Sequence, residues 1–329
     1  MKNKTALITG ICGQAGSYLA EILLKKNYKV VGLMRRNATR NLENASHLEN
    51  EPNLDIIEGD ITDFSSVLKS VQQTRPNEIY NLCAQSHVHT SFEQPLATFN
   101  IDTIGVINIL EAIKCLGYFN TRLYQASTSE LWGDSPPPQN EETIMRPRSP
   151  YAIAKLASHW MCKLYRESYG IYVCCGITHN FESPRRGPMF VTRKISMGVA
   201  RSLQDSSFKL KLGNLEAKRD WGYCPEYCEG WWKSLQQEEP DDYVFATNEM
   251  HSVQEFCEVA FNHVGLNWKN HVEIDRFLMR PIEVDFLCGD YSKAKNILNW
   301  EPKVKFDELV KIMVDYDCKL LGVFKEEEE

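Results

Sequence analysis

The chain has 329 residues, enough for one nucleotide-binding domain and a smaller partner domain. A hydrophobic fraction of 43% and a charged fraction of 25% are typical of a folded globular protein and argue against a disordered one. The net charge of -7 argues against a nucleic-acid surface, although it permits a local basic pocket for a phosphorylated ligand.

The cysteines and the termini suggest neither a metal protein nor a secreted one. The 11 cysteines are scattered, and the closest spacings, Cys174-Cys175 and Cys224-x-x-x-Cys228, form no paired Cys-x-x-Cys set. We therefore expect reduced thiols and no metal site. The apolar stretch near Met1 is too short for a signal peptide, and we expect no run of transmembrane length. The prediction is a cytoplasmic protein without a membrane partner.

The first elements have the order of a dinucleotide-binding unit. A predicted strand, Thr5–Thr9, leads into a glycine-rich turn, Gly10–Gly16, then a helical pattern and a second strand, Lys29–Met34. Glycines let the backbone approach a pyrophosphate, and a helix N-terminus offers amide donors. Where NAD would favour an acid, the sequence has Arg35-Arg36, which can neutralise a 2′-phosphate and so favours NADP. The alternative is a solvated basic pair at a strand end.

Further strands and helices alternate along the first half. The predicted elements are strands at Leu54–Glu58, Glu78–Leu82, Arg122–Ala126 and Ile171–Ile177, with helices at Ser65–Gln73 and Pro95–Leu116. This alternation predicts the α/β class, with a Rossmann-type doubly wound parallel sheet. Asp60 follows the third strand and is placed to accept a hydrogen bond from an adenine amino group. Small residues after the fourth strand would let the chain pass close to a cofactor.

Side chains suited to acid–base chemistry lie close together in the sequence. The strand Arg122–Ala126 places Thr128 and Glu130 at its carboxyl end, where ligands bind in an open parallel sheet. In the helix predicted next, Tyr151 and Lys155 are four residues apart and share one face. A nearby ammonium lowers the pKa of a phenol, which can then act as a base. Taken alone, such a pair often occurs by chance.

The second half changes character. After residue 179 come a loop with Arg185 and Arg186, a helix at Phe190–Leu203, a short strand at Phe208–Gly213 and two final helices, Ser292–Leu298 and Phe306–Leu320. Basic and amide residues recur here, as a second phosphorylated ligand would require. We expect residues 1–178 to bind the cofactor and carry the catalytic groups. Residues 179–325 should form a smaller α/β substrate domain, and the chain may cross between the two.

Longer segments resemble a known family. From Thr5 to about Val314 the chain resembles the extended short-chain dehydrogenase/reductases, and within them it closely resembles the GDP-mannose 4,6-dehydratases. The matching segments are Gly10–Tyr18, Tyr80–Val88, Tyr124–Gly133, Arg148–Lys155, Glu182–Gly187, Phe190–Ile195, Leu212–Asn214, Arg219–Gly222 and Arg280–Glu283. The resemblance implies a lyase of nucleotide-sugar metabolism that dehydrates GDP-mannose with a permanently held NADP, as in GDP-deoxyhexose synthesis. It also implies a homodimer or homotetramer.

The resemblance further implies the role of each catalytic group. Tyr151 would take the proton of the sugar 4-hydroxyl while hydride leaves C4, and Lys155 would tune Tyr151 and bind the nicotinamide ribose. Glu130 would remove the C5 proton, with Thr128 assisting as water leaves from C6. A carboxylate beside a ketone suits this proton abstraction, and a simple reductase has no need of it.

The remaining site residues follow from the same resemblance. Expected cofactor-binding residues are Gly10, Cys12, Gly13, Gln14, Gly16, Arg35, Arg36, Asp60, Ile61, Leu82, Ala84, Ser86, Tyr151, Lys155, Phe181 and Arg186. Expected substrate-binding residues are Ser86, Thr128, Ser129, Glu130, Asn180, Val191, Lys194, Gly213, Arg219, Arg280 and Glu283. Arginine and lysine would hold the diphosphate, with Glu283 near the sugar or nucleoside.

The chain departs from the family pattern at four places. These are Cys12 and Ala15 in the glycine turn, Phe181 in place of histidine, the pair Pro188-Met189, and the short segment Asn37–Asn53. In the family the last segment reaches a neighbouring subunit's cofactor, so tetramer assembly is open. The alternatives are a dehydratase acting on a GDP-manno-heptose and a GDP-sugar reductase or epimerase of the same fold. A nucleotide-sensing regulator is disfavoured, because it would not need Thr128, Glu130, Tyr151 and Lys155 together.

Overall fold

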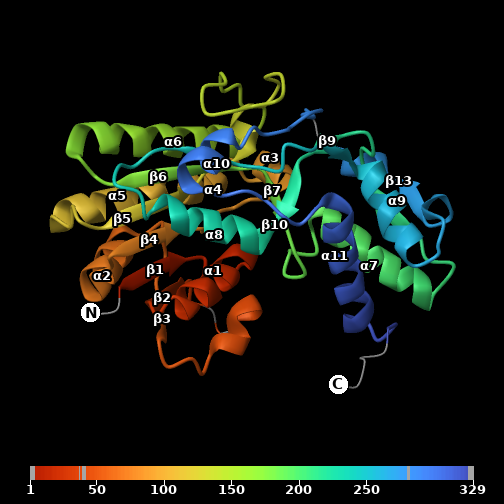
Figure 1. The fold of residues 1–329 in the computed structure, drawn as a ribbon, viewed down its shortest axis with the longest axis horizontal. Helices are drawn as coiled ribbons and strands as arrows, with labels where there is room; N and C mark the ends of the chain where they lie inside the picture. Colours follow the sequence, from red (N-terminus) through yellow and green to blue (C-terminus); the bar gives the residue numbers. More distant parts are fainter. Residues whose placement is uncertain (1–3, 37, 39–41, 280–281, 325–329) are drawn as a thin grey trace.

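A seven-stranded parallel sheet organises the larger of two lobes. The computed structural model describes residues 4–36, 38, 42–279 and 282–324, and Figure 1 shows the larger lobe at the left. The strand order is β11-β6-β5-β4-β1-β2-β3, and every neighbouring pair is parallel. The strands are β1 (Thr5–Thr9), β2 (Lys29–Met34), β3 (Leu54–Glu58), β4 (Glu78–Asn81), β5 (Arg122–Ala126), β6 (Val173–Thr178) and β11 (Tyr243–Phe245). The predicted fold class is confirmed.

Helices cover both faces of this sheet because its strands are apolar on both sides. In β1, Ala6 and Ile8 pack on one face, and Leu7 packs on the other. The first face is covered by α1 (Gln14–Lys25) and α8 (Cys224–Ser234). The second is covered by α2 (Phe64–Thr74), α5 (Gly105–Leu116) and α6 (Pro150–Tyr169). Two short helices, α3 (Val88–Glu93) and α4 (Pro95–Phe99), lie before α5 in the chain.

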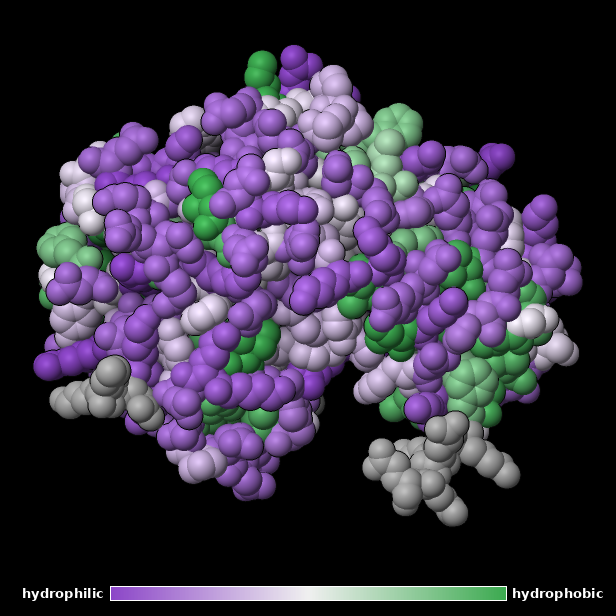
Figure 2. Space-filling model, viewed as in Figure 1, coloured by the Kyte–Doolittle hydropathy of each residue, from purple (hydrophilic) through white to green (hydrophobic). Residues whose placement is uncertain are grey.

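The smaller lobe has its own apolar core. Three helices form it: α7 (Val191–Gln204), α9 (Val253–His263) and α11 (Phe306–Leu320). Beside them lie short strand pairs: β7 (Asn180–Glu182) with β10 (Trp221–Tyr223), β8 (Leu210–Leu212) with β13 (Val272–Ile274), and β9 (Lys218–Arg219) with β12 (His251–Ser252). Helix α10 (Ser292–Leu298) contacts β11 and α8 instead. Figure 2 shows a largely hydrophilic face with a notch between the two lobes.

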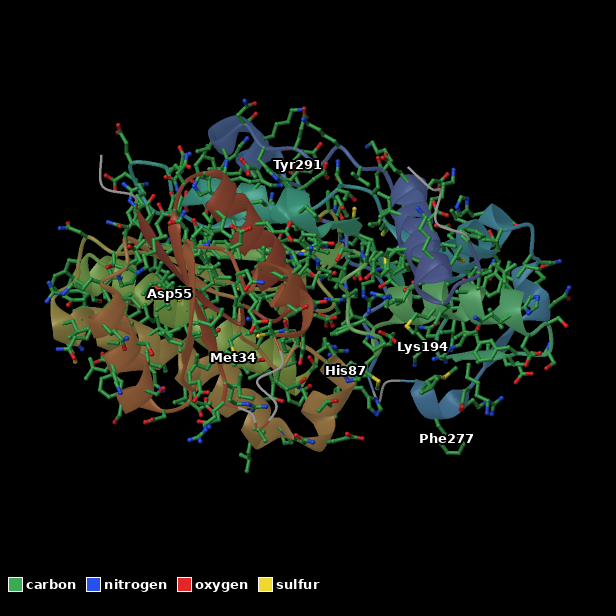
Figure 3. All side chains as sticks on the ribbon, turned by 90° about the horizontal axis from the view of Figure 1, so that it is seen from below. Met34, Asp55, His87, Lys194, Phe277 and Tyr291 are labelled. Atoms are coloured by element: carbon green, nitrogen blue, oxygen red, sulfur yellow. The ribbon has the colours of Figure 1, made fainter. Side chains whose placement is uncertain are left out.

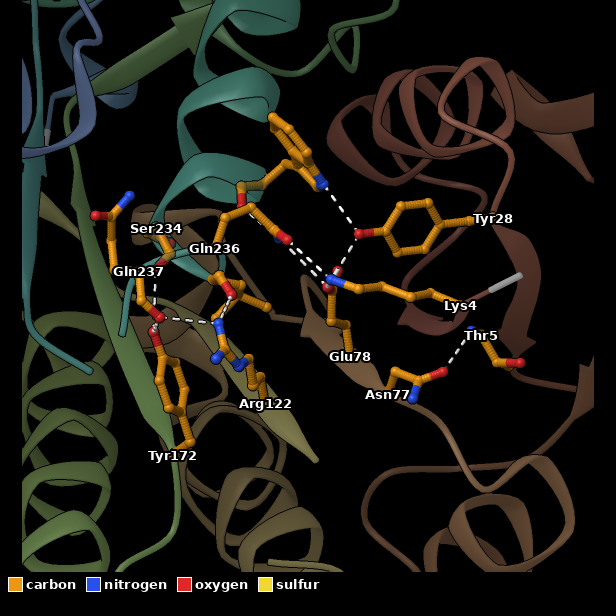
Figure 4. Close-up of polar contacts among 12 residues, drawn as sticks. Lys4, Thr5, Tyr28, Asn77, Glu78, Arg122, Tyr172, Ser234, Gln236 and Gln237 are labelled. Atoms are coloured by element: carbon orange, nitrogen blue, oxygen red, sulfur yellow. Dashed lines mark hydrogen bonds and ion pairs between the residues drawn. The ribbon is translucent and has the colours of Figure 1, made fainter. Parts of the chain in front are cut away.

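The chain returns to the larger lobe after it has entered the smaller one. Helix α8 packs against α1, and β11 adds an edge strand beside β6. Figure 4 shows a polar cluster that fixes this return at the amino end of the sheet. The buried Glu78 carboxylate accepts hydrogen bonds from Lys4, Tyr28, Tyr80 and, in the segment after α8, Gln236. Because both oxygens of this carboxylate are paired, the cluster serves to hold the returning segment on the sheet.

The predicted helix Pro95–Leu116 is one helical run with a π-helical turn at Asn100–Ile104 between α4 and α5. Our expectation that no run reaches transmembrane length was wrong, since this run has 22 residues and suitable hydropathy. Half of its apolar window is buried inside the protein. Its core-facing side packs on α2 and α6, as expected of a core helix of an α/β layer.

Candidate active site

The glycine turn between β1 and α1 has the shape that a dinucleotide requires. Gly10 has a φ of 72°, a left-handed conformation that side chains disfavour. A Cβ on Gly16 would lie 2.3 Å from the Gly10 carbonyl oxygen, so only glycine lets α1 start this close to β1. Helix α1 begins after Gly13 with no side-chain cap, which leaves its first amides for a ligand. These residues fit a bound dinucleotide.

Two other expected cofactor residues contact each other beside this turn. The Gln14 side-chain amide donates to the Phe181 carbonyl at 3.0 Å, and its oxygen accepts from the Ser183 hydroxyl at 2.5 Å. The Phe181 ring packs against Trp231 of α8 with its centroid 5.3 Å away. Phenylalanine therefore fills an apolar site where the family has histidine, and the Gln14 contact with its backbone does not depend on that change.

Part of the segment that departs from the family covers this turn. A 3₁₀ turn at Glu43–Leu48 packs against α1. The Asn44 side-chain amide donates to the carbonyls of Cys12 and Arg185, at 3.4 and 3.3 Å. Arg185 also pairs with Glu21 of α1 at 2.6 Å. The described part of the segment thus contacts its own subunit's glycine turn.

The expected adenosine-side residues gather after β2, β3 and β4. Burial, together with the charges of Asp102 and Asp60, raises the pKa of Cys83 to about 11, against the opposing charges of Lys155 and Arg35. The charges of expected cofactor residues from three segments therefore act on the Cys83 thiol. Arg36 is exposed and lies 3.8 Å from Glu58.

The other residues expected near the adenosine also have defined surroundings. One Asp60 oxygen accepts hydrogen bonds from the Thr62 amide and hydroxyl. Ile61 is buried against Gly105 of α5. After β4, the Thr9 hydroxyl accepts a hydrogen bond from the Leu82 amide at 3.2 Å. Ala84 is half-buried, and Ser86 is exposed.

Thr128 and Glu130 directly follow the carboxyl end of β5. The Thr128 hydroxyl accepts from the Glu130 amide at 3.3 Å and caps a 3₁₀ turn at Ser129–Leu131. This turn holds the Glu130 side chain, which is 8% exposed. A carboxylate that is almost buried yet lies at the ligand-binding edge of the sheet is suited to proton transfer.

Tyr151 and Lys155 face the same place from α6. Ser149 caps this helix by accepting a hydrogen bond from the Ala152 amide, and Tyr151 lies in the first turn. Tyr151 is 7% exposed and Lys155 is 2% exposed. The Lys155 ammonium donates to the Ala126 carbonyl at 2.6 Å, which joins α6 to the end of β5.

The electrostatics link Tyr151 to the other expected groups. Burial and the charges of Asp102 and Glu130 raise the pKa of Tyr151, while a hydrogen bond with Thr128 and the charge of Arg186 lower it. Burial lowers the pKa of Lys155, and Asp102 opposes that change. Thr128 and the carboxylate of Glu130 therefore lie close enough to Tyr151 to act on its phenol.

Arg186 has a partner that sequence reasoning missed. Its guanidinium lies 3.1 Å from the buried carboxylate of Glu182, which also accepts from the Thr192 hydroxyl at 2.6 Å. The same guanidinium lies over the Phe190 ring, 3.6 Å from its centroid. Glu182 and Phe190 thus fix the arginine beside Tyr151. The sequence signal for this pair was Glu182, an acid four residues before Arg186.

The expected substrate residues lie toward the smaller lobe. Arg219 of β9 pairs with Glu283 at 3.1 Å. Asn180 lies in β7, and Val191 and Lys194 lie in the first turns of α7. Figure 3 shows Lys194 near the junction of the lobes, on the side where His87 of the larger lobe is labelled. Arg280 lies outside the described residues.

A cavity of about 360 Å³ lies in the smaller lobe, away from Tyr151 and Lys155. Gly213, Asn214, Gln254, Trp268 and Met279 are among its lining residues. A Cβ on Gly213 would lie 2.7 Å from the Leu278 carbonyl oxygen, so only glycine allows these two segments to approach. Among the described residues, no group of three or more side chains is arranged to bind a metal ion.

Comparison with known proteins gives a consistent result. Residues 7–313 match the family described as GDP-mannose 4,6 dehydratase. The chain is 50% identical to GDP-mannose 4,6 dehydratase 1 of Arabidopsis thaliana, an alignment that covers 96% of this chain and 90% of the relative. It is 46% identical to the Homo sapiens GDP-mannose 4,6 dehydratase, with 96% and 92% covered.

Solved structures share the fold. The structure of Thermus thermophilus UDP-glucose 4-epimerase in complex with NAD superposes with a TM-score of 0.83 at 26% identity, covering 95% of this chain and 98% of that one. A Bacillus anthracis dTDP-glucose 4,6-dehydratase in complex with NAD gives 0.83 at 24% identity, covering 96% and 97%, and shows the fold alone. With the family match over most of its length and relatives near half identity, the chain belongs to the GDP-mannose 4,6-dehydratase family.

Proposed function

We propose that this protein is an enzyme that converts GDP-mannose to GDP-4-keto-6-deoxymannose and water. The observation that carries the proposal is the cluster at the carboxyl end of β5. There, the buried Glu130 follows Thr128, both act on the Tyr151 phenol, and the Lys155 ammonium is bound to the Ala126 carbonyl at the end of β5. An enzyme that only reduces or epimerises C4 needs the phenol and the ammonium, whereas a dehydratase also needs a base for the C5 proton. Family membership supports the same activity.

The reaction requires proton transfers that these side chains can perform. Tyr151 takes the proton of the sugar 4-hydroxyl, and the Lys155 ammonium favours the resulting phenolate. The ketone formed at C4 makes the C5 proton acidic, and Glu130 removes it. The C6 hydroxyl then leaves as water with the proton that Glu130 took, assisted by the Thr128 hydroxyl, and Tyr151 finally returns its proton to C5. A bound nicotinamide would supply the hydride acceptor for C4 and the hydride donor for C6, so that there would be no net redox change.

We assign the remaining residues by the part of the ligands that each suits. The glycine turn and the groups around Cys83 would hold the cofactor, with Phe181 and Arg186 near its nicotinamide end. Lys194 and Arg219 would bind the diphosphate of the sugar nucleotide. Residues 1–178 would carry the cofactor and catalytic groups and residues 179–325 the sugar nucleotide, with α8 and β11 returning to the first part.

GDP-mannose should lose one water without any added reductant, whereas UDP-glucose and dTDP-glucose should not react. The reason is that guanine and the axial 2-hydroxyl are recognised by the second half of the chain. Incubation of the purified protein with each nucleotide sugar, followed by mass spectrometry, tests this. Comparable turnover of UDP-glucose would contradict the proposal. A GDP-manno-heptose preferred over GDP-mannose would instead favour a shifted substrate, consistent with the changed residues Phe181, Pro188 and Met189.

NADP should bind at least tenfold more tightly than NAD, because Arg35 and Arg36 are exposed at the end of β2, where a 2′-phosphate would lie. Arg35→Asp should reverse or abolish that preference by repelling the phosphate. The measurement is a fluorescence titration of the parent and the variant with both dinucleotides. Lys29→Gln, at the opposite end of β2, is the matched control and should keep the preference. Equal affinities in the parent would overturn the assignment.

We further propose a cytoplasmic homodimer or homotetramer. The exposed face of α6 supports self-association, because it presents Ile153, Trp160 and Leu164, each more than half exposed. These residues are spaced by seven and four positions, so they form one apolar stripe along the helix. A second copy of the same stripe would cover it symmetrically.

A further inference from the structure

Asp102 is a buried carboxylate that neither the sequence motifs nor the proposed mechanism uses. It is 1% exposed and lies in the π-helical turn Asn100–Ile104. Its Oδ1 accepts a hydrogen bond from the Gln85 amide at 2.7 Å. Its Oδ2 is fully buried and has no hydrogen-bond donor within the described part of the chain. Burying a carboxylate oxygen without a donor is costly, so this group calls for a compensating charge.

The π-helical turn that carries Asp102 docks on the helix that carries Lys155. The next residue, Thr103, donates from its hydroxyl to the Ala154 carbonyl at 2.8 Å, one residue before Lys155. The charges of Asp102 and Lys155 act on each other. Turns of this kind, inserted in α-helices, occur frequently at functional sites. Here the inserted turn buries a carboxylate against the helix of Lys155.

Lys155 needs such a partner. Within the described residues, the Lys155 ammonium donates a hydrogen bond to the Ala126 carbonyl, which carries no negative charge. A buried ammonium without a counter-charge tends to lose its proton. We propose that Asp102 is the counter-charge that keeps the buried Lys155 protonated. Asp102 would thereby act on Tyr151 through Lys155, as a positioning residue. The inference rests on the proposed function, because it takes Lys155 as the partner of the catalytic phenol.

The charged and titratable groups around Asp102 set the direction of the pH effect. The charge of Asp102 acts on Lys155 and Tyr151 of α6 and on Cys83 in the segment after β4, and the charges of Asp60 and Arg35 also act on Cys83. Burial raises the pKa of Asp102 to about 6, so that it is an anion at neutral pH. Removing that anion takes away the largest influence that opposes burial at Lys155, so its pKa falls further. The lysine then becomes neutral at a lower pH than in the parent protein.

A second effect of the same charge has the opposite sign. Asp102 raises the pKa of Tyr151, so its removal alone would make the phenolate easier to form. The two effects predict different results for Asp102→Asn. If the support of Lys155 dominates, activity falls on the alkaline side. If the direct effect on Tyr151 dominates, activity at neutral pH rises.

The experiment compares Asp102→Asn and Asp102→Glu with the parent holoenzyme. Asparagine keeps an acceptor for the Gln85 amide and loses only the charge, whereas glutamate keeps the charge. Thr103→Val is the matched control, since it removes a hydrogen bond from the same turn without changing a charge. One measurement is the dependence of kcat and KM for GDP-mannose on pH. The other is NMR titration of protein labelled with ¹³C at the lysine Cε, with the Lys155 signal identified by Lys155→Arg.

We expect Asp102→Asn to lower the Lys155 pKa by at least about one unit and to move the alkaline limb of kcat to lower pH by a similar amount. At pH 8 its kcat should fall about 10-fold or more, with KM little changed, and Asp102→Glu should recover most of it. Thr103→Val should leave the Lys155 pKa where it is. An unchanged Lys155 titration in Asp102→Asn overturns the proposal. Because the NMR readout needs no turnover, it does so even if the parent proves inactive on GDP-mannose.

Discussion

Replacing Glu130 with glutamine should stop the loss of water while leaving the first oxidation intact. Glutamine keeps the shape and a hydrogen-bonding group but cannot accept the C5 proton, a loss expected to lower turnover by about 10²- to 10⁴-fold. The Glu130 charge raises the pKa of Tyr151, so its removal should not hinder the phenolate needed in the first step. The variant should therefore accumulate the 4-keto sugar with its 6-hydroxyl still in place.

Single-turnover kinetics can separate these two steps. The near-ultraviolet absorbance of the reduced nicotinamide should rise and persist in Glu130→Gln, and the C5 proton should not exchange with solvent deuterium. Glu141→Gln is a suitable control, because Glu141 is a half-buried carboxylate that accepts from the Val244 amide and should tolerate the change. Dehydration of GDP-mannose by Glu130→Gln near the parent rate would show that Glu130 is only structural.

Replacing Tyr151 with phenylalanine should abolish both half-reactions. The phenol is the proposed acceptor of the 4-hydroxyl proton, and phenylalanine cannot replace it. We expect turnover to fall by at least about 10²-fold, with no reduced nicotinamide formed in a single turnover. The aromatic ring and its buried packing are retained, so the variant should fold and bind the cofactor.

A tyrosine of the same helix gives the matched control. Tyr165 lies in α6, and its hydroxyl donates to Glu111, away from Thr128 and Lys155. Tyr165→Phe should keep near-parental turnover. The contrast between the two variants separates loss of the base from a general disturbance of α6. Reduced nicotinamide appearing in Tyr151→Phe at the parent rate would refute the assignment of the base.

Much of the larger lobe follows from local patterns in the sequence. β1, β2, β3 and β5 have the predicted bounds, because short apolar runs bounded by polar turns specify buried parallel strands. Tyr151 and Lys155 share a helix face because residues four apart always do. The three-residue strand β11 and the two-residue strands β9 and β12 were not predicted. Their pairing is set by tertiary contacts rather than by any local pattern.

The difference between local sequence patterns and tertiary contacts also decides which features of the site could be predicted. The effect of Thr128 on the Tyr151 phenol depends on how α6 docks on the end of β5, which no spacing in the sequence reports. Asp102 was missed because it lies in an apolar helical run, where an isolated acid reads as an exposed position. A lone carboxylate in a run that is otherwise buried is nevertheless a signal, since burying it requires a compensating partner.

The return of the chain to the larger lobe limits how such an enzyme can diversify. Helix α8 and strand β11 pack in the larger lobe, yet in the chain they lie between segments of the smaller lobe, where we propose that the sugar nucleotide binds. Recombination could join residues 1–178 to the second half of another protein. The edge of β6 and the apolar face of α1 would then be exposed, unless that second half supplied a strand like β11 and a helix like α8. New specificity in this chain is therefore expected to arise by single substitutions, as at Phe181 in β7 and Pro188-Met189 in the following loop, rather than by exchange of halves.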